Sequence, residues 1–157
     1  MDADVYAVTV CVLIQRGDTW LLGVRAPDVA YAPNMIGMIG GHVEVIRPLA
    51  DVLEATARRE VAEEVGLDLS QATLRYLESE FFITDRGERQ ITVTFTAQAP
   101  SGIEPYVNAA DELIEVGSVA SGERTERKKP NAIRTAAIGK ATLTTHLIPS
   151  ERVASST

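Results

Sequence analysis

Three carboxylates and a guanidinium stand together in the run Arg59-Glu60-Val61-Ala62-Glu63-Glu64-Val65-Gly66-Leu67. On a helix each residue turns by about 100°, so Glu60, Glu63 and Glu64 fall within one narrow arc. Like charges at this spacing destabilise a helix by roughly a few tenths of a kcal/mol per pair. A hard divalent cation offsets the repulsion, because Mg²⁺ and Mn²⁺ prefer carboxylate and water oxygens. The spacing therefore predicts a divalent-metal site.

The same run has the pattern of a helix that docks on a core. Ala57, Val61 and Val65 lie at i, i+4 and i+8 and form an apolar stripe beside the acids. Gly66 supplies the left-handed residue at which such a helix ends. An isolated Glu-x-x-Glu-Glu is a weak signal, since Glu-rich helix faces are usually solvated surface, and the residues upstream decide between the two interpretations.

A glycine pair lies upstream, in Met38-Ile39-Gly40-Gly41-His42-Val43-Glu44. Together the two runs resemble the signature of the Nudix hydrolases, G-x5-E-x7-R-E-U-x-E-E-x-G-U with U aliphatic, and its second half matches in full. The resemblance implies an α/β fold, an α/β/α sandwich around a mixed sheet, with its core over about residues 5–141. It also implies Mg²⁺-dependent hydrolysis of a nucleoside diphosphate linked to another moiety.

The resemblance assigns roles to individual residues. The implied metal ligands, for Mg²⁺ or alternatively Mn²⁺, are the carbonyl of Gly40 and the carboxylates of Glu60, Glu63 and Glu64. Arg59 would orient these glutamates, since a guanidinium fixes carboxylate geometry well. Either Glu63 or Glu112 would take the proton of the attacking water. Relatives often place an additional acid where Glu112 stands, although a polar loop without a metal role explains it equally well.

The first half of the signature departs from the family pattern. Counting back from Arg59 puts Asp51 at the glutamate position, whereas counting forward from the glycine pair puts Arg47 there. We therefore predict a lengthened loop over Val45–Ala50. The helix should begin at or after Pro48, which would cost about 3 kcal/mol in a helix interior. A contact between Asp51 and Arg59 is the candidate replacement for the glutamate–arginine pair of the family.

Two further readings compete with a Nudix enzyme. A non-catalytic Nudix-like module that binds or senses a nucleotide is favoured by the lengthened loop, but the three retained glutamates count against it. A structural acidic helix in an unrelated fold is disfavoured by the glycine pair. Phosphate or pyrophosphate release with and without Mg²⁺ separates these alternatives.

The sequence favours one class of substrate only by eliminating others. ADP-ribose-cleaving relatives usually carry a proline about fifteen residues beyond the signature, and dinucleoside-polyphosphate relatives a tyrosine at a similar distance. This chain has Phe82, Ile83 and Thr84 there, and its next proline is Pro100. A nucleoside triphosphate, (d)NTP, or a modified nucleotide is therefore favoured, whereas nucleotide sugars lack a firm marker.

The length and net charge of the chain limit the kinds of partner that it can be expected to bind. The 157 residues suit a single domain, and 45% hydrophobic content is ordinary for a globular protein. The net charge of −7 argues against a nucleic-acid duplex or an anionic membrane surface. A small-molecule nucleotide is the expected partner, and the sequence is compatible with a homodimer.

The expected compartment is the cytoplasm. Cys11 is the single cysteine and cannot form an internal disulfide. The apolar run Val5–Ile14 is too short to span a bilayer. It follows Asp2 and Asp4 with no basic residue before it, unlike a signal peptide. A buried strand is the better interpretation of this run.

The hydrophobic pattern predicts six strands and two helices. The strands are expected over Tyr6–Ile14, Trp20–Arg25, Met35–Val43, Leu74–Phe82, Ile91–Ala97 and Leu113–Val119. The helices are expected over Val52–Val65 and Pro130–Leu143, with a loose tail from Pro149.

Overall fold

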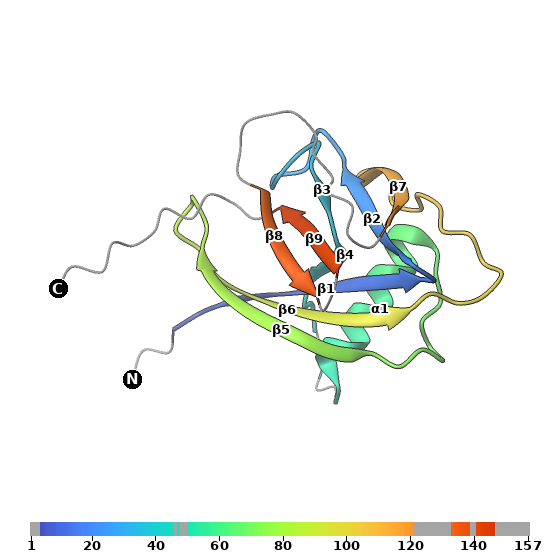
Figure 1. Ribbon diagram of the computed structural model, residues 1–157. Helices are drawn as coiled ribbons and strands as arrows, with labels where there is room; N and C mark the ends of the chain where they lie inside the picture. The colour runs from blue at the N-terminus through green and yellow to red at the C-terminus, as the bar shows by residue number, and fades with distance from the viewer. Residues whose placement is uncertain (1–3, 46, 48–49, 121–132, 139–140, 147–157) are drawn as a thin grey trace.

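The computed structural model describes residues 4–45, 47, 50–120, 133–138 and 141–146, the last two ranges without side chains. A seven-stranded mixed sheet forms its frame (Figure 1), with strand order β3-β2-β1-β6-β5, β4 beside β1 and β7 beside β2. The strands are β1 (Ala7–Arg16), β2 (Thr19–Arg25), β3 (Ile36–Gly37), β4 (Ile39–His42), β5 (Arg75–Ile83), β6 (Arg89–Gln98) and β7 (Leu113–Ala120). All six strands predicted from the hydrophobic pattern are present, and the third is divided into β3 and β4.

The core lies between the centre of the sheet and helix α1 (Val52–Val65). β1 and β6 run parallel, so that Val10 faces Val93 and Val12 faces Phe95, all four buried. The apolar stripe of α1 packs onto this surface, and its three members are completely buried: Ala57, Val61 and Val65. Burying a valine side chain in this way contributes about 1.5–3 kcal/mol. The predicted docking face of the helix is therefore confirmed.

The two ends of α1 follow from single residues. Gly66 ends the helix in the left-handed conformation, at φ 69°, as its position predicts. Asp51 precedes the helix, also left-handed at φ 50°, and makes no side-chain capping bond. In the described part of Val45–Ala50 no residue is helical, so the helix begins after Pro48 as predicted. Ile46, Pro48 and Leu49 themselves lie outside the described residues.

The second predicted helix, over Pro130–Leu143, is wrong. The chain forms an antiparallel pair of strands instead, β8 (Ile133–Ile138) and β9 (Ala141–His146). The first segment contains two isoleucines and a threonine and the second three threonines, and these β-branched residues favour a pleated strand over a helix. In Figure 1 this hairpin lies in front of the sheet and α1 behind it, with β9 close to β3. The α/β class and the mixed sheet are confirmed, but among the described residues a hairpin replaces the second helical layer; the expected tail from Pro149 lies outside them.

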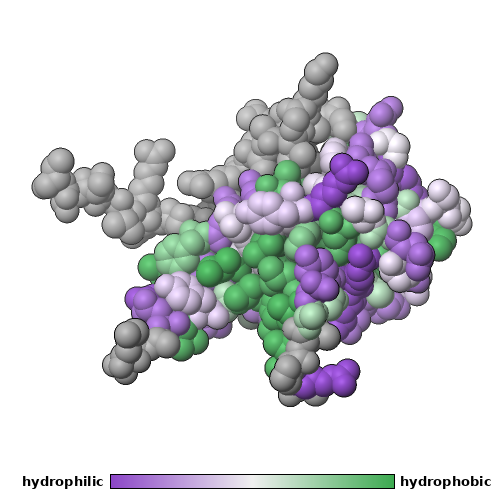
Figure 2. Space-filling model, turned by 90° about the horizontal axis from the view of Figure 1, so that it is seen from below, coloured by the Kyte–Doolittle hydropathy of each residue, from purple (hydrophilic) through white to green (hydrophobic). Residues whose placement is uncertain are grey.

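Apolar side chains also reach the surface of the molecule. Figure 2 shows a continuous apolar area on the lower face, bordered by polar and charged groups. The edge strand β5 exposes Phe81 and Ile83, and the ring of Tyr6 meets that of Phe81 edge to face. In the described part of the chain, no helix is both long and apolar enough to cross a membrane.

Candidate metal centre

Three carboxylates converge where α1 meets the segment just ahead of β7. Glu60 and Glu64, one turn apart on α1, and Glu112, just ahead of β7, each offer an oxygen within 4.8 Å of the others. Glu60 is 6% exposed and Glu64 2% exposed, whereas Glu112 is open to solvent. Two distant segments thus supply a set of hard oxygen donors that suits a divalent cation.

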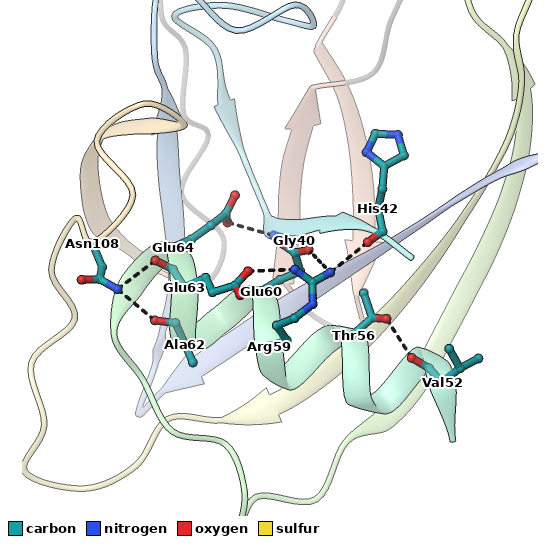
Figure 3. Close-up of polar contacts among 10 residues, drawn as sticks. All are labelled: Gly40, His42, Val52, Thr56, Arg59, Glu60, Ala62, Glu63, Glu64 and Asn108. Atoms are coloured by element: carbon teal, nitrogen blue, oxygen red, sulfur yellow. Dashed lines mark hydrogen bonds and ion pairs between the residues drawn. The ribbon is translucent and has the colours of Figure 1, made fainter. Parts of the chain in front are cut away.

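The glycine pair brings β4 against these acids. The N–H of Gly40 donates to Glu64 Oε2 at 3.0 Å (Figure 3). A Cβ on Gly40 would lie 2.0 Å from the carbonyl oxygen of Val10, and one on Gly41 would lie 2.5 Å from the carboxyl carbon of Glu60. Only glycine allows so close an approach. The sequence led us to expect the Gly40 carbonyl at the metal, whereas the contact that the structure shows is the N–H to Glu64.

Arg59 ties the acidic helix to the same strand. Its Nη2 lies 2.6 Å from Glu60 Oε1 and donates to the carbonyl of His42 at 3.1 Å, and its Nη1 donates to Glu63 Oε2 at 2.8 Å. Glu63 is 57% exposed and stands outside the carboxylate cluster. The three glutamates expected in one arc are therefore divided: Glu60 and Glu64 turn toward β4, and Glu63 turns toward solvent beside Arg59.

The electrostatics of the cluster favour a cation. Burial raises the pKa of Glu64 to about 8, the charges of Glu112 and Glu60 add to the effect, and the hydrogen bond from Gly40 opposes it. Burial likewise raises the pKa of Glu60, although the Arg59 guanidinium counteracts it. Without a cation, then, part of this negative charge is removed by protonation. A bound divalent ion would stabilise the carboxylates in their ionised form.

Comparison with known proteins identifies the family. The NUDIX domain model matches residues 5–134. The chain belongs to the Nudix family. A MutT Nudix hydrolase from Burkholderia pseudomallei has a similar structure, with a TM-score of 0.66 and 26% sequence identity over 80% of this chain and 92% of that one. The predictions of a MutT-like Nudix enzyme and of its fold are thereby confirmed, and the structural acidic helix of an unrelated fold is excluded.

More distant Nudix relatives share the fold. An Ap4A hydrolase from C. elegans matches with a TM-score of 0.57 and 17% identity, over 73% of this chain and 80% of that one. A bifunctional NMN adenylyltransferase/ADP ribose pyrophosphatase from Francisella tularensis matches with a TM-score of 0.54 and 22% identity, over 76% of this chain and 35% of that one. Among curated proteins, none matches the chain.

After the lengthened loop, the glutamate–arginine contact of the family has no counterpart between Asp51 and Arg59. Among the described residues, Arg59 pairs with Glu60 and Glu63 but not with Asp51. Eight residues of helix separate Asp51 from Arg59 by about 12 Å along the axis. The carbonyl of Asp51 instead accepts the N–H of Ala55 at 2.9 Å and so closes the first helical turn. Asp51 therefore serves the start of the helix and not the arginine.

Two other residues near the cluster lack the properties of a ligand or nucleophile. His42 is exposed, and in Figure 3 its ring points away from the glutamates. Burial and the charge of Glu64 raise the pKa of the Cys11 thiol to about 12, so the thiol stays protonated at neutral pH. Among the described residues of the site, the candidate metal ligands are therefore the carboxylates.

The sequence did not indicate the segment that binds the C-terminal end of α1. Main-chain N–H groups of Tyr106 and Asn108, and the side-chain amide of Asn108, donate to carbonyls of the last helical turn. The Asn108 side chain and Ala62 are 46 residues apart. No local pattern marks such a contact, and only a signal linking distant positions could have found it.

Proposed function

We propose that this Nudix protein is a divalent-metal-dependent pyrophosphohydrolase that cleaves a nucleoside diphosphate linked to another moiety. The observation that carries the proposal is the convergence of Glu60, Glu64 and Glu112 within 4.8 Å, two of them buried. Crowded, largely buried acids are costly unless a cation shares the site. Hydrolysis of a phosphoanhydride needs such a cation beside its phosphates.

Each residue of the centre has a proposed task. Glu60, Glu64 and Glu112 hold the cation, with Mg²⁺ first and Mn²⁺ as an ion that the same oxygens accept. Arg59 fixes Glu60, and the N–H of Gly40 fixes Glu64, so neither carboxylate has to be ordered when the cation binds. When bound, the cation supplies charge neutralisation at the phosphates and lowers the pKa of a water molecule.

The proton of the attacking water goes to Glu63 or Glu112. Glu63 is exposed, and one of its oxygens is held by Arg59. Glu112 is part of the cluster itself. Glu63→Gln and Glu112→Gln separate the two, because loss of a general base lowers kcat and changes its pH profile. Measured at saturating Mn²⁺, the variant with the larger loss of kcat and the altered pH profile identifies the acceptor.

The proposed substrates are nucleoside triphosphates or modified nucleotides. The support is the sequence at Phe82, Ile83 and Thr84, which lacks both the proline and the tyrosine markers. Fold neighbours named for Ap4A and for ADP-ribose make nucleotide derivatives in general a reasonable class. A panel of (d)NTPs, oxidised dGTP, nucleotide sugars, Ap4A and ADP-ribose tests this. If ADP-ribose gave the highest kcat/KM, the substrate would be wrong while the metal chemistry stood.

A nucleotide-sensing module is the second candidate. The observation in its favour is the lengthened loop before α1: among the described residues, Arg59 pairs with Glu60 and Glu63 of its own helix and not with Asp51, the candidate substitute for the family glutamate. Phosphate or pyrophosphate release from the panel, with Mg²⁺ and with EDTA, decides between the two. Mg²⁺-dependent release supports the enzyme. Nucleotide binding without release from any substrate would support the sensor.

The proposed setting is the cytoplasm, with a small-molecule nucleotide as partner. The support is chemical: the chain has a single cysteine and a net charge of −7. A reducing compartment leaves a lone thiol unmodified, and an acidic surface repels nucleic-acid duplexes. Fractionation of cells that express the full chain measures the location directly.

A further inference from the structure

The last turn of α1 obtains its hydrogen-bond partners from a distant loop. The last four carbonyls of an α-helix, here those of residues 62–65, lack partners in the regular helix and take donors from the capping residue or from elsewhere. Asn108 serves three of them, through its main-chain N–H to Glu64 at 2.9 Å and its side-chain amide to Glu63 at 3.0 Å and Ala62 at 3.3 Å. In Figure 3 this amide faces the end of the helix that bears the acids. One side chain thus binds the turn that carries Glu63 and Glu64.

The neighbouring residue Tyr106 fixes the same loop by packing. Its N–H donates to the carbonyl of Val65 at 3.2 Å. A Cβ on Gly66 would lie 2.3 Å from the Tyr106 ring, so the loop lies directly against the end of the helix. With Gly66 N–H on the Ala62 carbonyl at 3.1 Å, all four carbonyls of the turn are satisfied. The register between loop and helix is therefore set by several contacts together.

The loop leads straight to the third carboxylate. The N–H of Glu112 donates to the carbonyl of Ala109 at 3.0 Å, and that of Leu113 donates to the same oxygen at 2.9 Å. The carbonyl of Glu112 accepts the N–H of Ala26 at 2.8 Å. A tight turn thus joins Asn108 to Glu112, and the backbone of Glu112 is held on both sides. The contacts of Asn108 with the helix and the position of Glu112 are therefore connected through four residues of backbone.

We infer that Asn108 is a positioning residue that fixes Glu112 against the acidic helix and thereby sets the metal affinity of the carboxylate cluster. The inference rests on the proposed function, in which Glu112 is a metal ligand. The Asn108 amide is bound to helix carbonyls and lies outside the proposed ligand set, so its effect would act through the loop. Residues that orient metal ligands typically contribute about 10- to 100-fold to metal affinity.

A double-mutant cycle on Mn²⁺ binding tests the inference. Binding of Mn²⁺ alone is followed by electron paramagnetic resonance for the wild type, N108A, E112Q and the double variant. We expect N108A to weaken binding about tenfold and to have no further effect in the E112Q background. N108D should weaken binding at least as much as N108A, because its carboxylate faces helix carbonyls.

Gln98→Ala is the matched control. Its side-chain amide also donates one exposed hydrogen bond, to Gln15 Oε1 at 2.8 Å, but at the far end of β6. We expect wild-type Mn²⁺ affinity for Q98A. Thermal melting without metal reports any general loss of stability, which would lower Tm in both backgrounds but leave the affinity of the folded protein unchanged.

Three results would overturn the inference. The first is wild-type Mn²⁺ affinity in N108A, and the second is an equal loss on adding N108A to E112Q. The third is wild-type affinity in E112Q, which would also remove Glu112 from the ligand set. The hydrolysis assay on the wild-type chain tests the proposed function separately, so failure of the one is distinguishable from failure of the other.

Discussion

Glu64 is the residue on which the centre depends most. It is 2% exposed, accepts a hydrogen bond from Gly40 and lies beside both other carboxylates of the cluster. An ionised group so placed is stable only when hydrogen bonds and an opposite charge compensate for lost hydration. Gly40 supplies one hydrogen bond, and a cation would supply the charge. Replacement of this carboxylate should therefore remove metal binding without opening a cavity.

Glu64→Gln tests this at the level of one side chain. The amide keeps the shape but removes the charge, so we expect kcat to fall roughly a hundredfold or more while the fold is retained. Steady-state kinetics in Mg²⁺ measure the change, and circular dichroism checks the fold. Glu54→Gln, on the first turn of the same helix, is the matched control and should keep near-wild-type kcat. A kcat for E64Q within about twofold of wild type would contradict the assignment.

The sequence predicted these residues unevenly, and for physical reasons. Glu60, Glu63 and Glu64 follow from helical period, which is local. Which of them is buried depends on how α1 docks on β4, and helical period does not contain that information. For Glu112, a metal role and a polar loop without one explained the sequence equally well, since only the fold brings this residue to α1. Asn108 gave no signal, because its partners lie on a distant helix.

Strand β4 and helix α1 fit together through the glycine pair. On Gly40 a side chain would meet the backbone of Val10, whereas on Gly41 it would meet the Glu60 carboxylate. A backbone obstacle cannot move without disturbing the ladder between β4 and β1, but a carboxylate can turn away. Gly40 is therefore required for the pairing of β4 with β1, and Gly41 for the position of the Glu60 carboxylate in the candidate metal site.

Replacing each of the two glycines with alanine should separate an effect on stability from an effect on metal binding. We expect Gly40→Ala to lower the free energy of unfolding by about 3 kcal/mol, from overpacking and backbone strain. Gly41→Ala should change stability less but weaken Mn²⁺ binding about tenfold, by displacing Glu60. Urea unfolding and Mn²⁺ titration measure the two effects. Gly37→Ala, where an added Cβ meets nothing within 4 Å, is the control. Wild-type Mn²⁺ affinity in G41A would contradict this role for the glycine.

The hairpin β8–β9 shows where element prediction failed. Pro130 and Asn131 are typical of a helix start, and the residues that follow contain alanines that favour a helix. Isoleucine and threonine in the same stretch favour strands. A hairpin also pairs its own backbone groups, which a lone strand cannot. Local start signals are therefore weaker evidence than the composition of the whole segment.

Across the whole molecule, the carboxylate cluster couples folding to protons and, with the proposed cation bound, would couple it to metal. The pKa of Glu64 rises from an ordinary 4.5 to about 8 on folding, chiefly because of burial. Between these values the folded chain keeps a proton that the unfolded chain has released. Stability of the metal-free protein therefore falls as pH rises through this window. A cation that binds only the folded chain has the opposite effect, and its affinity rises with pH because it displaces protons.

Thermal melting as a function of pH measures this coupling. In EDTA we expect Tm to fall from about pH 5 to pH 8, and saturating Mg²⁺ should restore it most at the alkaline end. Glu64→Gln carries no titrating group at this position and should show a flatter profile in EDTA. If Tm of the wild type in EDTA rose over this range instead, Glu64 would not hold its proton on folding.

Anomalous diffraction from crystals grown with Mn²⁺ most directly tests the central claim, that Glu60, Glu64 and Glu112 hold a divalent cation. Mn²⁺ scatters anomalously and takes the same oxygen ligands as Mg²⁺. We predict an anomalous peak within about 2–2.5 Å of a carboxylate oxygen from each of the three residues. A Mn²⁺ ion bound elsewhere, with these three carboxylates outside its coordination sphere, would contradict the claim.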